Sequence, residues 1–266
     1  MATAFGARIL LLCPHPDDEV VGFCAAIGRA RAAGSKVAVL FLTHGCVSRG
    51  TMWPWARVRY DEAVARRRAE GERACAELGI EIAGGSARPA RYLWRELAAA
   101  EAEVRAAIGR TGADQLWVTA FEGGNPDHDG ASAIASRLAA GGMSVLEFAE
   151  YNLLGGKIRP HTFPAPNGAE EVLALTEAEQ AAKRRAVAIY VSERGNLRDI
   201  DYRRETFRPL PKYDYGAPPH PGKLWWARFQ WVPFRHPMVD FTTPAEVYGA
   251  IAAYLGRADS ESLRPD

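Results

Sequence analysis

Apolar residues gather in short continuous runs that alternate with amphipathic segments along the chain. A continuous apolar run is typical of a strand that is covered on both faces, as in a parallel sheet. Such runs lie at 7–13, 36–42, 115–120 and 144–149, and the stretch 90–94 indicates a further, short edge strand. Helical spacing of apolar residues is found at 18–33, 61–78, 97–108, 131–140 and 177–190.

This alternation predicts an α/β fold that is Rossmann-like, with a mostly parallel sheet and helices on both faces. The 266 residues are enough for one α/β domain with a single core. No G-x-G-x-x-G motif follows the first apolar run, which argues against a dinucleotide-dependent enzyme.

The amino-acid composition limits the kinds of molecule that the protein is expected to bind. Hydrophobic residues make up 48% of the chain and charged residues 24%, as in an average globular protein. The formal net charge of +1 gives no electrostatic basis for binding nucleic acid or an anionic membrane, so we expect a small or largely neutral substrate. The run after Arg8 is too short for a signal-peptide core or a membrane span. The sequence favours no particular oligomeric state.

The cysteines indicate the compartment. The four of them, at positions 13, 24, 46 and 75, form no C-x-x-C pair, and three sit in or beside apolar runs. Buried free thiols in a reducing cytosol explain this distribution better than a disulfide framework does. We therefore expect a cytoplasmic protein.

Polar residues follow two of the apolar runs in a pattern that suggests a metal site. The first run leads into Pro14-His15-Pro16-Asp17-Asp18-Glu19, where an imidazole lies within three residues of two carboxylates. Helix N-terminal amides would keep these carboxylates ionised. Taken alone, the stretch is equally consistent with a capped helix preceded by a turn-forming proline.

A second stretch, Asn125-Pro126-Asp127-His128-Asp129-Gly130, follows the run at 115–120. In a parallel sheet both stretches leave the carboxyl ends of their strands, at the edge where open α/β sheets bind ligands. We therefore expect them to meet. His44 follows the run at 36–42 and should lie at the same edge, either touching substrate or serving as an ordinary loop residue.

These residues resemble the PIG-L or LmbE-like family of zinc-dependent N-acetylglucosamine deacetylases. The family's first motif, P-H-P-D-D-E, is unaltered here, and its second, H-P-D-H, appears as Asn125-Pro126-Asp127-His128. A weaker third pattern, R-x-x-E-x-x-x-A-x-x-x-L-G, is met by Arg67, Glu70, Ala74, Leu78 and Gly79. The resemblance covers roughly the first 150 residues well and the remainder loosely.

The resemblance implies roles for individual residues. His15, Asp18 and His128 would bind one Zn²⁺ ion or a similar divalent metal ion. Asp17 would be the general base, with Asn125 and Asp127 as further catalytic residues. Asn125 stands where the family usually has the first histidine of its second motif, which is linked to oxyanion stabilisation or proton delivery.

The resemblance also suggests a substrate-binding role for Arg67, which would reach the ligand; the alternative is an exposed salt bridge on a charged helix face. His44 is the second candidate for substrate binding, on the basis of its position at the sheet edge.

The C-terminal part has a different texture. Residues 198–238 are rich in Pro, Tyr, Trp and Arg without clear periodicity, which predicts ordered loops or short strands. We expect a single domain with an α/β core at about 1–155 and an irregular elaboration at about 156–266. This elaboration would build the substrate pocket over the catalytic edge, with Trp225 and Trp226 contacting the distal part of a large substrate; alternatively it is a lid or a partner surface.

The expected reaction is hydrolysis of an N-acetyl group from an amino sugar or an N-acetylglucosamine conjugate. Two alternatives stay open. A family member with little or no activity could act as a binding or regulatory protein, for which Asn125 is the main evidence, or the enzyme could hydrolyse another amide or an ester.

Overall fold

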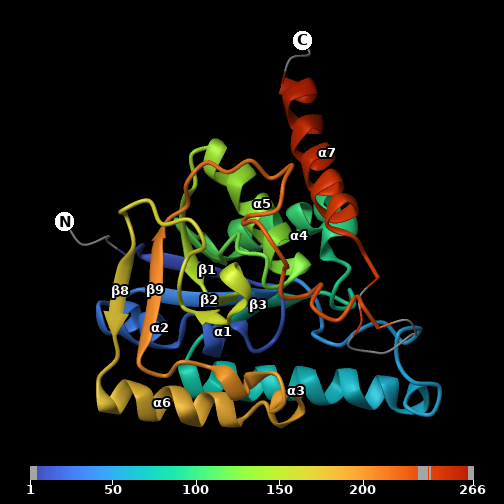
Figure 1. Ribbon diagram of the computed structural model, residues 1–266. Coiled ribbons are helices and arrows are strands. Elements are labelled where there is room, and N and C mark those ends of the chain that lie inside the picture. Colours follow the sequence, from blue (N-terminus) through green and yellow to red (C-terminus); the bar gives the residue numbers. More distant parts are fainter. Residues whose placement is uncertain (1–4, 233–238, 240, 263–266) are drawn as a thin grey trace.

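A seven-stranded sheet forms the centre of the molecule (Figure 1). The computed structural model describes residues 5–232, 239 and 241–262. Across the sheet the strands are β3 (Glu81–Gly85), β2 (Lys36–Phe41), β1 (Arg8–Cys13), β4 (Gln115–Thr119), β5 (Ser144–Ala149), β9 (Arg204–Pro209) and β8 (Glu171–Ala174). The first five are parallel, and β9 is antiparallel to both of its neighbours. The predicted mostly parallel α/β sheet is therefore confirmed.

Helices cover both faces of the sheet because its central strands are apolar on both sides. In β1, Leu10 and Leu12 face one core cluster, whereas Ile9 and Leu11 face another. The first cluster is covered by α4 (Leu97–Thr111), α5 (Pro126–Ala140) and α7 (Pro244–Ser262). The second is covered by α2 (Cys24–Ala32) and by Cys75 of α3 (Tyr60–Leu78); α6 (Glu177–Ala188) lies outside them on the same side (Figure 1).

The strand order reverses direction between β1 and β4. From β1 the chain proceeds outward to β2 and β3, and from β4 it proceeds the other way to β5. The loops that leave the carboxyl ends of two strands diverge at such a point and leave a crevice between them. The two polar stretches of the sequence are these two loops.

Two of the predicted helices differ in the structure. The predicted helix at 18–33 is two helices, α1 (Asp18–Val21) and α2, and α5 begins at Pro126 rather than at position 131. The chain breaks at Gly22, where a Cβ atom would lie 2.7 Å from Glu150 Oε1. The carboxylate of Glu205 in β9 accepts hydrogen bonds from the first amides of α2, and this tertiary cap is invisible in the local sequence.

The predicted edge strand at 90–94 is wrong. The edge strand beside β2 is β3, whose residues are largely exposed and therefore lack a strong apolar signal. Residues 90–94 form a turn with one isolated bridge between Ala90 and Val47, followed by a short 3₁₀ helix, Leu93–Arg95. The apolar side chains of Leu93 and Trp94 are buried in the helical layer and not in the sheet.

The C-terminal part is more regular than predicted. Its strands β8 and β9 extend the sheet, and α7 buries Val247, Tyr248 and Ile251. A small two-stranded ribbon, β6 (Tyr151–Asn152) and β7 (Arg159–Pro160), follows β5. Positions 233–238 of the predicted irregular region lie outside the described residues. Within the described ranges, none of the helices is both long enough and apolar enough to cross a bilayer.

Candidate metal centre and active site

Three of the predicted residues meet at the crevice between β1 and β4. His15, Asp18 and His128 are buried, and each offers a ligand atom within 4.8 Å of the others. His128 Nε2 lies 3.3 Å from Asp18 Oδ1, and His15 Nδ1 lies 3.6 Å from Asp18 Oδ2. Residues 113 positions apart therefore form one compact donor cluster, as the topology of the sheet predicts.

Asp127 orients His15. Its Oδ2 atom lies 3.0 Å from His15 Nε2, so the other ring nitrogen of His15 faces the cluster. Asp127 also accepts hydrogen bonds from the backbone amides of Arg91 and Leu93. Arg91 adopts a left-handed φ of 70°, which is costly for a residue with a side chain and which presents its amide to Asp127. A carboxylate behind a ligating histidine fixes the tautomer and raises the basicity of the ring.

Asp17 stands beside the cluster in a constrained backbone conformation. Its φ is 137°, and its amide donates to Glu19 Oε2 at 2.9 Å, which holds this turn. Arg67 Nη2 donates to Asp17 Oδ2 at 2.9 Å. Among the described residues nothing donates to Asp17 Oδ1, so this oxygen is available to a molecule in the crevice.

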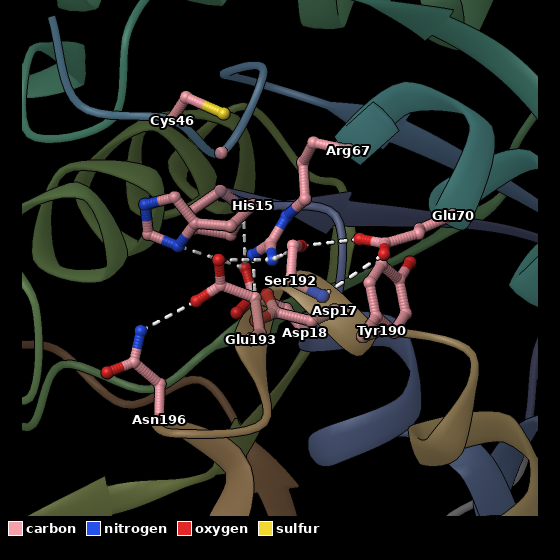
Figure 2. A network of polar contacts seen from close by, with 12 residues as sticks. His15, Asp17, Asp18, Cys46, Arg67, Glu70, Tyr190, Ser192, Glu193 and Asn196 are labelled. Atoms are coloured by element: carbon pink, nitrogen blue, oxygen red, sulfur yellow. Dashed lines mark hydrogen bonds and ion pairs between the residues drawn. The ribbon is translucent and has the colours of Figure 1, made fainter. Parts of the chain in front are cut away.

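Arg67 is neither an exposed surface charge nor a free ligand-binding group. It is 2% exposed and lies between Asp17 and Glu193, with 2.7 Å from its Nη1 to Glu193 Oε1 (Figure 2). The neighbouring Ser192 is held by Glu70, one turn along α3 from Arg67. The third sequence pattern thus positions the Asp17 carboxylate through a buried ion pair.

The charges in the cluster favour a cation. Although burial opposes the charged form, Asp18 and Asp127 raise the pKa of His15 to about 10. The pKa of Asp18 is lowered because the two histidines outweigh the effect of burial. Burial raises the pKa of Asp17 against the opposing charge of Arg67. Without a metal ion, a proton on His15 supplies the positive charge that the carboxylates attract.

His128 enters the cluster from the first turn of α5. The loop before it is fixed by Asp129, whose Oδ1 accepts from the amides of Glu122 and Gly123 and whose Oδ2 accepts from Tyr248 at 2.8 Å. Asp129 was not predicted as a functional residue. Its position directly after the ligand, in the first turn of a helix, was the signal available in the sequence.

Asn125 is the N-cap of α5. Its Oδ1 accepts from the Asp127 amide at 2.9 Å, which fixes the plane of the side-chain amide. Its Nδ2 group donates to no described residue. Asn125 therefore has a structural role that a histidine would fill less well, and it keeps a free donor at the same time.

Both ring nitrogens of His44 contact residues of its own loop and of the helix that follows it. Its Nδ1 accepts from the Cys46 amide at 3.2 Å, and its Nε2 lies 3.1 Å from the Tyr60 hydroxyl. Burial lowers the pKa of His44, in keeping with a neutral ring. The structure thus places His44 in a loop-anchoring arrangement, apart from the three clustered donors.

Two aromatic residues lie beside the cluster: Trp225, which was predicted to contact substrate, and Tyr151, which was not predicted. The Tyr151 ring lies edge-on to His128 with 5.8 Å between centroids, and Trp225 lies 5.9 Å from Tyr151. The Trp225 amide donates to Gly123 in the loop after β4. Trp226, by contrast, is buried in the core, so the two tryptophans do not act as a pair.

The donor set fits a divalent metal ion such as zinc. Zinc bonds of about 2.0–2.2 Å in a tetrahedral arrangement place ligand atoms about 3.4 Å apart, close to the separations measured between the histidine nitrogens and Asp18. A catalytic zinc centre typically has three protein ligands, such as two histidines and one carboxylate, and keeps its fourth position for water or substrate. A structural zinc centre has four protein ligands instead. His15, Asp18 and His128 are the residues that would hold the ion.

Fold and site together define a doubly wound α/β protein with a two-histidine, one-carboxylate cluster at its switch point. Residues 10–139 match the PIG-L family, described as GlcNAc-PI de-N-acetylase. The resemblance seen in the sequence is thereby confirmed over this part of the chain. Among the curated proteins, none matches the sequence.

Solved structures with a similar fold include three deacetylases. A deacetylase of the teicoplanin biosynthesis pathway is 18% identical, with 78% of this chain and 99% of that chain covered and a TM-score of 0.61. The A40926 pseudoaglycone deacetylase is 19% identical over 79% and 99% of the chains, with a TM-score of 0.62. N,N'-diacetylchitobiose deacetylase from Pyrococcus horikoshii is 17% identical over 77% and 84%, with a TM-score of 0.51. At these identities the likeness establishes the fold.

Proposed function

We propose that the protein is a metal-dependent deacetylase that hydrolyses the N-acetyl group of an amino sugar or of a glycoconjugate containing one. The observation that carries this proposal is the meeting of His15, Asp18 and His128 beside Asp17 at the switch point of the sheet. The family description and the three deacetylases of the same fold support the reaction class.

The residues around the cluster have complementary tasks. A divalent ion held by the cluster would supply a water of lowered pKa and polarise the acyl oxygen. Asp17 accepts the proton of the attacking water at Oδ1, while Arg67 holds Oδ2 and favours the ionised carboxylate. Asp127 keeps His15 in the tautomer whose Nδ1 faces the cluster.

Asn125 is placed to assist the acyl oxygen. Its amide plane is fixed by the cap on α5, so its Nδ2 group is a preorganised neutral donor for the negative charge that develops on that oxygen. An asparagine cannot deliver a proton. The leaving amine therefore takes its proton from Asp17, which gained one in the attack, or from solvent.

Asn125 is also the observation that favours the second candidate function, a binding protein that keeps the metal but has lost turnover. The two functions differ in a single measurable property, the release of acetate. A hydrolase of another amide or an ester would release a different acid from its own substrate.

The test is acetate release from a panel of N-acetylglucosamine conjugates, measured with the metal content of the same preparation. We expect about one divalent ion per chain, which His128→Ala should abolish. Asp17→Asn should keep the ion and lose on the order of a hundredfold or more in turnover. Metal binding without acetate release from any conjugate would favour the binding protein, and full metal content in a triple variant of His15, Asp18 and His128 would refute the ligand set.

A further inference from the structure

A half-buried arginine without an acidic partner lies next to the proposed active site. The guanidinium of Arg228 stacks on Trp225, with 3.7 Å from its Cζ to the ring centroid, and on Phe229 at 4.5 Å. Its Nη1 donates to the Trp225 carbonyl at 2.7 Å. Within the described ranges, no carboxylate forms an ion pair with Arg228. By contrast, the buried Arg67 and Arg208 are each paired with two carboxylates.

A continuous row of aromatic rings connects Arg228 to the metal cluster. His128 contacts Tyr151, Tyr151 contacts Trp225, and Arg228 lies on the face of Trp225. The Trp225 amide donates a hydrogen bond to the Gly123 carbonyl in the loop after β4, and Leu224 packs against the same glycine. The guanidinium is therefore held in place from the loop that carries His128 into the site.

The electrostatic environment of Arg228 disfavours its positive charge. Burial lowers the pKa of Arg228, and the charges of Arg91 and Arg198 lower it further, while Tyr151 opposes them. Arg91 is itself attached to the site, because its amide bonds the carboxylate that orients His15. Arg91 also lines a cavity of about 480 Å³ together with Arg95, Ser48, Thr51 and the acidic Glu246.

A partly desolvated guanidinium among like charges is costly unless an anion completes the site. The guanidinium fork matches carboxylates and phosphates, to which it donates two parallel hydrogen bonds. We propose that Arg228 binds an anionic substituent, a carboxylate or a phosphate, on the substrate whose N-acetyl group faces the metal cluster. This inference rests on the proposed deacetylase function and adds the charge class of the substrate, which the overall charge of +1 conceals.

The test compares three substrates of the metal-loaded protein: N-acetylglucosamine, N-acetylglucosamine 1-phosphate and the carboxylate-bearing N-acetylmuramic acid. We expect a KM at least about tenfold lower for one of the anionic sugars than for the neutral one, since a charged hydrogen-bonded pair contributes that much. The anionic sugar with the lower KM shows whether the phosphate or the carboxylate is the group recognised. Arg228→Gln should remove the preference and leave kcat for N-acetylglucosamine unchanged, whereas Arg228→Lys should retain part of it.

Arg184 provides the matched control, because it is exposed and stacks on Tyr202 at 5.1 Å, away from the site. Arg184→Gln should leave all three KM values as they are. An anionic preference that survives in Arg228→Gln, or equal KM values for all three sugars in the wild type, would overturn the subsite while leaving the deacetylase proposal intact. If none of the sugars releases acetate, the deacetylase proposal is wrong, but the proposed anion subsite is not yet tested by that result. Calorimetry then measures whether the anionic sugars bind to the wild type and to Arg228→Gln. Unchanged binding in the variant, or no binding to the wild type, would reject the subsite.

Discussion

The Oδ2 atom of Asp127 lies 3.0 Å from Nε2 of His15 and also accepts a hydrogen bond from the Arg91 amide, while Oδ1 accepts one from the Leu93 amide. Both oxygens of the carboxylate are thus engaged by protein groups. The sequence motif suggested a catalytic residue at this position, and the geometry instead favours a carboxylate that orients a metal ligand.

Asp127→Asn should therefore weaken metal binding rather than abolish chemistry directly. The neutral amide gives a weaker partner for the ring, and loss of such a contact costs about 10–100-fold in metal affinity. The measurement is competition for zinc against a chelator of known affinity. Asp61→Asn is the control, because Asp61 is exposed and pairs only with Arg49 at the surface. Equal zinc affinity in wild type and Asp127→Asn would contradict the orienting role.

Residues adjacent in the sequence could be predicted to act together, as in the first motif, and the parallel-sheet rule brought His128 to His15 across 113 positions. Contacts that depend on distant segments could not be predicted. Glu193 lies more than 120 residues from Arg67, and nothing local to either residue marks them as partners.

The C-terminal part illustrates the same limit for the fold. Four of the six residues of strand β9 are polar or charged, and two of these charges are buried: Glu205 caps α2, and Arg208 pairs with Glu147 inside the protein. These buried charges hide the strand from a reading based on hydrophobicity. They also connect this segment to α2 and β5, so β9 is an integral strand of the sheet.

Arg67→Met should strongly destabilise the protein and reduce turnover. The substitution keeps much of the side-chain volume but leaves Asp17 and Glu193 without their shared cation. Breaking a buried pair in this way costs about 3–5 kcal/mol. Chemical denaturation of the metal-free protein measures the loss of stability. Arg185→Met, which removes an exposed pair with Glu77, should change the free energy of unfolding by less than about 1 kcal/mol.

If Arg67→Met and Arg185→Met lost the same free energy of unfolding, the Arg67 network would contribute no more to stability than an exposed ion pair does. If Arg67→Met lost stability but kept full turnover, Asp17 would not need its arginine, and its role as the base would be in doubt.

His161 should make the protein less stable in mild acid. The side chain is 2% exposed, with its ring nitrogens 3.0 Å from the Ala149 carbonyl and 3.1 Å from the Asp201 carbonyl. Burial and the charge of Lys183 outweigh these carbonyls and lower the pKa of His161 to about 3. In the unfolded chain the pKa is about 6.5. Between these values the unfolded state binds more protons, so stability falls as the pH drops below about 6.5 and this effect levels off near 3.

The comparison uses His161→Asn, since asparagine tolerates the left-handed φ of 48° at this position. Between pH 7.5 and pH 5 the wild type should lose about 2 kcal/mol more than the variant, as the linkage of one such group requires. Urea unfolding at both pH values gives the four free energies. Parallel losses in the two proteins would assign the acid sensitivity to other groups.

Asn125 combines two roles, and substitutions can separate them. Asn125→Asp keeps an oxygen that accepts from the Asp127 amide but removes the Nδ2 donor, so the helix cap should survive and turnover should fall by about a hundred- to a thousandfold. Asn125→Ala removes both and should in addition cost about 1 kcal/mol of stability. Thr176→Ala is the control for the cap alone: Thr176 caps α6 at the surface, so its loss should cost similar stability without affecting turnover.

The pH dependence of turnover distinguishes a neutral donor from a proton carrier. Because an amide does not titrate, wild-type turnover should lack the alkaline limb that a required imidazolium imposes, and Asn125→His should introduce one. Turnover of Asn125→Asp equal to wild type at every pH would reduce Asn125 to a helix cap. A wild type that releases no acetate, together with an active Asn125→His variant, would instead mean that asparagine at this position converts a deacetylase site into a binding site, because the metal cluster and Asp17 are present in both proteins.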